Sequence, residues 1–364
     1  MTKGITEEIP AWVRQVKVRP QLVVAFTRQL ATMLQSSVPI LVALDTLSNQ
    51  VEDPNFGEVV RRCCEKIETG GALSRAMGQF PTVFPNIYVT MVQIGESTGS
   101  LDASLDSLAL WLERDEALRQ RLRAALTYPA LVFSLAFLMT LAIFYTVMPT
   151  FVSIFSDMKM ELPAITRVMM FITKALASPP DMLITIGLLV ALWTNFRRWV
   201  VTRKGRRAFY RFCLKIPVLG GMILCGGLAR YCSSMEALLR TGMSLIKSLR
   251  LAADASGNPL LETDAVAMVA SVSEGEPVAA HMERFPDLYP VTLKNMVASG
   301  EEVSQLPEMF ARTAAFYEVE MNYRVDALGA TLEPVLLGLV SIIIGSIVMS
   351  IFLPLYSYIG QLGA

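Results

Sequence analysis

Histidine is almost absent from this chain of 364 residues, which contains only His281. One histidine excludes a multi-histidine metal site, and the zinc motif HExxH does not occur. The phosphate-binding loop GxxxxGKS/T is also missing. We therefore expect no metal, no cofactor and no catalytic residue, and we interpret the chain as a protein that is not an enzyme.

Cysteine pairing and net charge are equally uninformative about chemistry. The five cysteines include no CxxC spacing, and we expect them to be reduced, buried apolar residues. The 32 basic residues cancel the 32 acidic ones, so the overall charge does not indicate a nucleic-acid partner. The basic, aromatic-containing segment 197–211 follows an apolar run, which is more typical of a topology signal near anionic lipid.

Charge is also missing from long stretches of the chain. No acidic or basic residue lies between Arg123 and Asp157, and the apolar run inside this gap is about 28 Å long as a helix. A second uncharged run extends from Glu333 to the C-terminus. A third candidate begins at Met182 but is short. It spans a membrane only if the arginines that follow it extend to the interface.

The distribution of lysine and arginine predicts the orientation of these spans. Arginines gather before the first span and after the second, whereas the loop between the two is poor in them. By the positive-inside rule we expect the large polar segments to lie in the cytoplasm and the C-terminus to lie outside. Residues 1–25 lack the apolar core of a cleavable signal peptide.

The expected segments are a cytoplasmic segment 1–25, a cytoplasmic helical domain 26–127, transmembrane helices 128–152, 182–201 and 334–356, an external loop 153–181, a second cytoplasmic domain 202–333 and an external tail 357–364.

The chain also contains an internal duplication. With an offset of 205 residues, segment 26–151 aligns with 231–356 without a gap, and about twenty positions are identical. Units of this size are duplicated domains rather than the short repeats of a solenoid. Each copy is a polar segment followed by an apolar run.

Apolar residues in both polar segments recur at helical spacing, and neither segment has a convincing strand pattern. We therefore predict an all-α membrane protein with two duplicated cytoplasmic bundles and three transmembrane helices. Both copies keep a Gly-Glu pair, Gly95-Glu96 and Gly300-Glu301, which we place at a turn before a helix. Two interpretations stay open for Glu96 and Glu301: a carboxylate near a positive helix end, or an acidic corner that contacts a partner.

Two further motifs invite a functional interpretation. Gly95 to Gly99 fits GxSxG, but the nucleophile elbow needs a strand and a histidine base, and the second copy lacks the serine. In the last span, Gly338, Ser341 and Gly345 form a stripe of small residues where another helix can approach. That helix is either the first span of the same chain, with its small residues Ser134, Ala136 and Thr140, or a span of another protomer.

The sequence resembles the inner-membrane platform proteins of type II secretion systems and type IV pili, the general secretion protein F and pilus assembly protein C family. The resemblance rests on paired segments in both copies and covers roughly residues 20–360. These segments are FTRQLATMLQSSVPILVAL with ARYCSSMEALLRTGMSLIKSL, GALSRAMGQFPTVFP with EPVAAHMERFPDLYP, MVQIGESTGSL with MVASGEEVSQL, and ALTYPALV with ATLEPVLLG. One departure is Met243-Ser244, where the family favours Val-Pro, as at Val38-Pro39.

The resemblance implies a non-enzymatic, homo-oligomeric platform that couples a hexameric cytoplasmic ATPase to the extraction and polymerisation of pilins or pseudopilins, alongside other inner-membrane assembly proteins. It favours type IV pili over type II secretion. A membrane adaptor or receptor-like scaffold is the alternative. The gene neighbourhood would decide between the two, because adjacent genes for a secretion ATPase and pilins would support the platform. A small-solute transporter fits less well, because it would carry polar or charged groups within its spans, and these runs have no acidic or basic residue.

Overall fold

The computed structural model describes residues 17–157, 179–216 and 219–362, and every regular element in these ranges is a helix. The expected all-α class is thus confirmed for this part of the chain. Most of the predicted N-terminal segment and external loop, and the last two residues of the predicted tail, lie outside the described ranges. The other predicted segment boundaries stay predictions.

The chain divides into two compact units. One combines Met1–Arg121 with Cys213–Asn322, and the other combines Leu122–Phe212 with Tyr323–Ala364. The first unit contains the polar part of both repeats, and the second contains the apolar runs.

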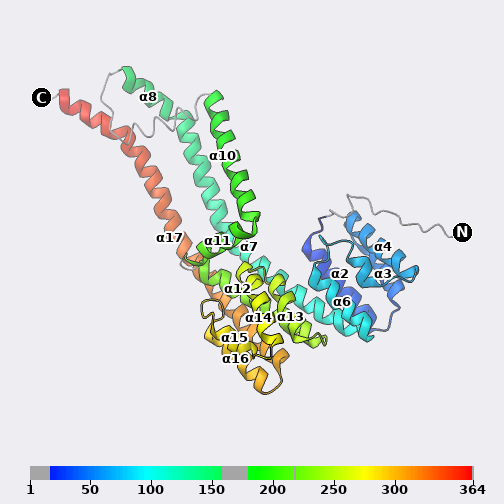
Figure 1. Cartoon of the computed structure of the whole chain (residues 1–364). Coiled ribbons are helices and arrows are strands. Elements are labelled where there is room, and N and C mark those ends of the chain that lie inside the picture. The colour runs from blue at the N-terminus through cyan, green and yellow to red at the C-terminus, as the bar shows by residue number, and fades with distance from the viewer. Residues whose placement is uncertain (1–16, 158–178, 217–218, 363–364) are drawn as a thin grey trace. The chain divides into compact units, whose positions relative to one another are not determined.

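The first repeat forms a bundle from short helices and the start of a long one. The helices are α2 (Pro20–Gln35), α3 (Ile40–Gln50), α4 (Pro54–Glu68), α5 (Leu73–Met77), α6 (Asn86–Thr98) and α7 (Leu101–Thr146) (Figure 1). Phe26, Phe56 and Phe84 pack against one another in its core, and Tyr88 lies against Phe84. Proline at the first position and the Asp53 cap explain where α4 begins.

The second repeat repeats this order. Its helices are α12 (Leu219–Arg240), α13 (Leu245–Ala255), α14 (Pro259–Ser273), α15 (Val278–Glu283), α16 (Val291–Glu302) and α17 (Leu306–Leu362). The helices α3 to α7 each begin 205 residues before their counterparts α13 to α17. The duplication read from the sequence is therefore also a duplication of structure.

The left-handed backbone positions are shared as well. Gly70 and Gly275 both have positive φ, 81° and 91°, and each ends a helix. At two other equivalent positions glycine and serine alternate: Ser37 (φ 62°) corresponds to Gly242 (φ 82°), and Gly99 (φ 71°) corresponds to Ser304 (φ 55°). Such a backbone suits glycine because it has no Cβ. The turn geometry has thus persisted even where its preferred residue has not.

The second unit holds the helices that follow the two bundles. Helices α7 and α17 continue into their apolar runs without a break, over 46 and 57 residues. Both are long and apolar enough to cross a membrane, and a bent pair of helices, 204–214 with 219–240, would make a third span if it counts as one. The predicted middle span, 182–201, falls on α10 (Pro179–Val201), but a third transmembrane helix at α10 stays a prediction. After α7 the chain turns into α8 (Met148–Asp157), so the first predicted span ends in two helices.

All five cysteines are free, and four of them are buried, as expected. Only Cys213 is partly exposed. Burial raises the pKa of the Cys63 thiol to about 12, which keeps it protonated and unreactive at neutral pH.

Candidate partner-contact surfaces

Glu96 caps a helix within its own bundle. Its carboxylate accepts hydrogen bonds from the backbone N–H groups of Leu73 and Ser74, and from the Ser74 hydroxyl, at the start of α5. These are donors that a helix start leaves without intrahelical partners. The side chain is half-buried beside an open cleft of about 600 Å³, lined in part by Arg75 and Gln93.

Glu301 does the same in the second repeat. It accepts hydrogen bonds from the N–H groups of Val278 (2.6 Å) and Ala279 (3.0 Å) at the start of α15. Both glutamates therefore lie at a positive helix end, but the helix is α5 or α15, earlier in the chain, and not the helix that follows the pair. A contact of either carboxylate with a partner stays a proposal.

The expected turn at the Gly-Glu pairs is wrong. Gly95 lies in the last turn of α6, and Gly300 lies in the last turn of α16. A Cβ on Gly95 would come within 2.8 Å of Ser104, and one on Gly300 within 3.0 Å of Met309. The glycines are thus retained for close contact between consecutive helices rather than for a turn. The same geometry removes the strand that the GxSxG elbow would need before Ser97.

The single histidine belongs to a buried polar cluster found only in the second repeat. Its Nε2 lies 3.3 Å from both carboxylate oxygens of Asp264, and its Nδ1 lies 3.2 Å from Ser271 Oγ. The Tyr289 hydroxyl donates a hydrogen bond of 2.6 Å to Asp264, and burial raises the pKa of this phenol. In the first repeat, the equivalent positions are Val59, Lys66, Ala76 and Phe84.

Sequence reasoning missed this cluster because it treated His281 alone. The signal was available: three apolar positions of one copy are ionisable in the other. Among the described residues, no group of three or more His, Cys, Asp or Glu side chains is placed to hold a metal ion.

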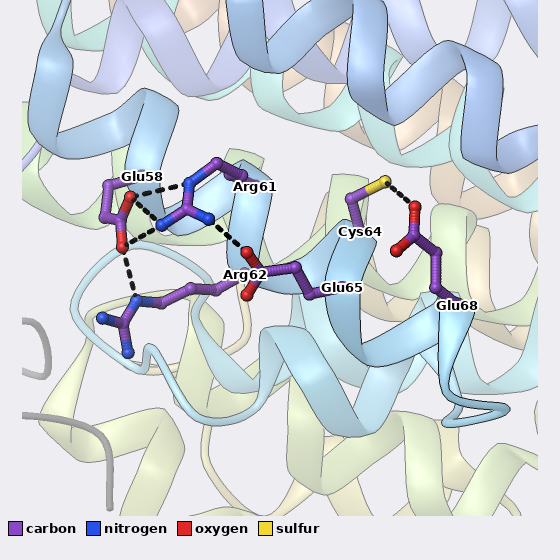
Figure 2. A network of polar contacts seen from close by, with 6 residues as sticks. All are labelled: Glu58, Arg61, Arg62, Cys64, Glu65 and Glu68. Carbon is purple, nitrogen blue, oxygen red and sulfur yellow. Dashed lines mark hydrogen bonds and ion pairs between the residues drawn. The ribbon is translucent and has the colours of Figure 1, made fainter. Parts of the chain in front are cut away.

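The outer face of α4 carries a network of charges. Figure 2 shows Arg61 and Arg62 both reaching Glu58, at 2.6 Å and 2.8 Å, and Arg61 also reaching Glu65. Cys64 and Glu68 complete the row, with Sγ 4.0 Å from Oε1. These are surface pairs three and four residues apart, each of which adds only a few tenths of a kcal/mol. The equivalent face of α14 carries no charge at these positions, which are Thr263, Val266, Ala267, Ala270 and Ser273.

The two repeats touch through a specific contact between α7 and α12. The indole N–H of Trp111 donates a hydrogen bond of 2.9 Å to Ser234 Oγ, and Trp111 is only 6% exposed. Arg114 pairs with Glu236 at 2.7 Å, and Arg240 lies 3.2 Å from the same carboxylate. The last helix of repeat one thereby covers the first helix of repeat two.

The predicted stripe in the last span faces outwards. Gly338, Ser341 and Gly345 are all exposed, and a Cβ on either glycine would meet nothing within 4 Å. Within the second unit, Ala136 instead lines a groove of about 230 Å³ with Leu336, Leu337 and Val340. A role of the stripe between protomers stays a prediction.

Together, two equivalent helical bundles and two long apolar helices that continue from them define a duplicated membrane protein. The family model described as type II secretion system protein F matches it twice, at residues 26–149 and 231–354. The chain belongs to this family.

Curated relatives carry names from two related systems. A type IV pilus assembly protein PilC of Thermus thermophilus is 34% identical over 93% of this chain and 82% of its own length. A PilC protein of Pseudomonas aeruginosa is 28% identical over 93% of this chain and 90% of its own length. A type II secretion system protein F of the same species is 29% identical over 91% of this chain and 81% of its own length.

Proposed function

We propose that this protein is the inner-membrane platform of a type IV pilus machine, and that it couples a cytoplasmic assembly ATPase to the extraction and polymerisation of pilins. The observation that carries the proposal is the duplicated family domain, which covers both bundles and both long apolar helices. Membership of the family makes the chain a component of a pilus or secretion system. The coupling itself is our inference.

The architecture supports a mechanical rather than a chemical role. Each bundle ends in a helix that continues without interruption into an apolar run, so a force on the bundle has a continuous helical path towards the membrane. The apolar runs carry no acidic or basic residue between Arg123 and Asp157 or after Glu333, which disfavours a solute path through them.

The choice of pilus over secretion rests on the relatives. The one at 34% identity is named for pilus assembly, whereas the pilus and secretion proteins of Pseudomonas aeruginosa match about equally, at 28% and 29%. In a strain lacking the gene, we expect surface pili to disappear while secreted enzymes remain in the medium. Loss of secretion with normal piliation would instead assign the chain to type II secretion.

The coupling is tested with the full-length protein in detergent and the assembly ATPase of the same organism. We expect the two to co-purify, and we expect the platform to change the rate of ATP hydrolysis. The control is the same mixture with an ATPase from the other system of that organism. Equal binding to both ATPases, or to neither, would contradict the proposal.

A further inference from the structure

The α7 residues that contact α12 have repeat equivalents on α17, and these equivalents are exposed. Trp111 and Arg114 of α7 pack on α12, and their repeat equivalents on α17 are Phe316 and Val319. Phe316 is 45% exposed and Val319 is 53% exposed, whereas Trp111 is 6% exposed. These two residues make up the α17 face.

The other side of the contact also has a free equivalent. Ser234 and Ala237 are buried on α12, and the same positions in the first repeat are Gln29 and Thr32 of α2. Both are exposed. Gln29 and Thr32 make up the α2 face. Within one molecule, α7 of the first repeat packs on α12 of the second. The equivalent surfaces, on α17 of the second repeat and on α2 of the first, stay exposed.

We propose that the α17 face of one molecule binds the α2 face of a second copy of this chain, in the manner in which α7 covers α12 within one molecule. Such a contact is heterologous, because the two surfaces differ, and it links further copies into a ring if its rotation closes or into an open filament if it does not. The proposal does not depend on the coupling to an ATPase.

The chemistry of the two contacts differs. The ion pair of Arg114 and Glu236 is only partly buried, since the Arg114 side chain is 39% exposed. Its equivalents are Val319 and Ala31, so neither position keeps a charge. We therefore expect the association between molecules to be driven by apolar burial around Phe316 and Val319. It should persist at high ionic strength, because salt screens charge pairs but not apolar contacts.

The expected orientation of the protein in the membrane is compatible with this contact. Both bundles belong to one compact unit, and each is followed by an apolar run in the same direction along the chain. Since we expect both bundles to lie in the cytoplasm, a second copy that repeats the internal relationship should keep its bundles on the same side of the bilayer, as parallel repeats do.

Cross-linking between differently tagged full-length copies tests the geometry. All five native cysteines are replaced by alanine, one copy carries Gln29→Cys, and the other carries Phe316→Cys. A short bismaleimide should give a mixed-tag product in membranes, at low and at high salt. The absence of that product would overturn the proposal. So would equal cross-linking of Phe316→Cys copies with each other, since that would place two α17 faces together.

Self-association of the purified protein tests the energetics. Val319→Asp should weaken the association in detergent at least tenfold. Val42→Asp on α3 is the matched control, because Val42 is 54% exposed and lies on neither face. A Val319→Asp protein that unfolds at the temperature of the wild type but associates as strongly would exclude the α17 face.

Discussion

Glu96 and Glu301 are the clearest case in which two residues at equivalent positions do the same work. Each carboxylate accepts both backbone N–H bonds at the start of a short helix, α5 or α15. We predict that Glu96→Ala and Glu301→Ala each lower the free energy of unfolding by about 1–2 kcal/mol, as loss of a helix cap does. Chemical denaturation would measure this, and Glu302→Ala, which removes an exposed neighbouring carboxylate, is the control.

The glutamine variants separate capping from partner contact. If Glu96→Gln keeps wild-type stability but loses binding to the ATPase, the acidic corner is a contact surface. If stability falls while the folded fraction binds normally, the carboxylate serves only its own bundle.

Ser37 and Ser304 adopt a backbone that glycine adopts in the other repeat. Since a left-handed conformation costs a residue with a Cβ roughly 1 kcal/mol, we predict that Ser37→Gly and Ser304→Gly stabilise the protein by about 0.5–1 kcal/mol. Thermal unfolding is the measurement. Gly275→Ala should shift it the other way, because Gly275 has φ 91° although a Cβ there meets no atom within 4 Å. A loss of stability in both serine variants would show that their hydroxyls matter more than the backbone.

Glu113 and Glu318 are equivalent glutamates with opposite electrostatic environments. Arg28 donates two hydrogen bonds to Glu113, at 2.7 Å and 2.8 Å, and these lower its pKa. The position of Arg28 is Ser233 in the second repeat, and burial raises the pKa of Glu318. A lowered pKa stabilises the fold above the usual range of a glutamate, and a raised pKa destabilises it there.

At pH 7 we therefore predict that Glu318→Gln raises the melting temperature and Glu113→Gln lowers it. The Glu113 effect should be below about 1 kcal/mol, because the pair is partly exposed. Both differences should shrink as the pH falls through the range in which glutamates become protonated. Melting curves of the wild type and both variants from pH 4 to pH 8 would measure these differences. If both variants shift the melting temperature in the same direction at pH 7, this account is wrong.

At the scale of helices, the small-residue stripe of α17 carries a prediction of its own. A leucine at position 345 has room in the monomer, because a Cβ there meets nothing within 4 Å. We predict that Gly345→Leu remains folded but weakens self-association in detergent, since close approach of a second helix needs the small residue. Ile342→Leu, at an exposed position, is the control. Unchanged association with a less stable monomer would instead place the stripe against the first span.

Most helices could be predicted from the sequence, and the exceptions have physical causes. Apolar periodicity located the helices, and Asp53-Pro54 and Asn258-Pro259 marked the starts of α4 and α14. The pattern could not show that Gly95 and Gly300 lie inside helices, because glycine is typical of both turns and close helix contacts. The distinction depends on Ser104 and Met309, which only the folded bundle brings near. The capping by Glu96 and Glu301 could not be predicted for the same reason. The helix starts that these carboxylates reach lie about 22 residues earlier in the chain, and only the folded bundle brings them together.

At the scale of the whole molecule, orientation in the membrane is the main prediction. We expect cysteines introduced at Met160 and Leu362, in a background without native cysteines, to react with an impermeant maleimide in cells with a permeabilised outer envelope. Glu302→Cys, at an exposed position that we expect to face the cytoplasm, should be protected. Protection of the cysteine at 362 would mean that the middle span does not cross the membrane.

The duplication is the feature that could be predicted most completely from the sequence. The ungapped offset of the sequence alignment is also the offset between the starts of equivalent helices. The contact between the repeats could not be predicted in the same way. Trp111 and Ser234 show no shared pattern in the sequence, and they meet only because α7 packs on α12.

The cluster around His281 also bears on how the two halves of the gene have evolved. Val59, Ala76 and Phe84 in one core stand where Asp264, His281 and Tyr289 stand in the other. An exchange such as Val59→Asp, or the reverse Asp264→Val, would leave a buried polar group without its partner, at a cost of about 1–3 kcal/mol. A conversion of one core towards the other at a single position should therefore give a less stable protein. We expect the complete polar cluster to be gained or lost without this cost only when several of its positions change together.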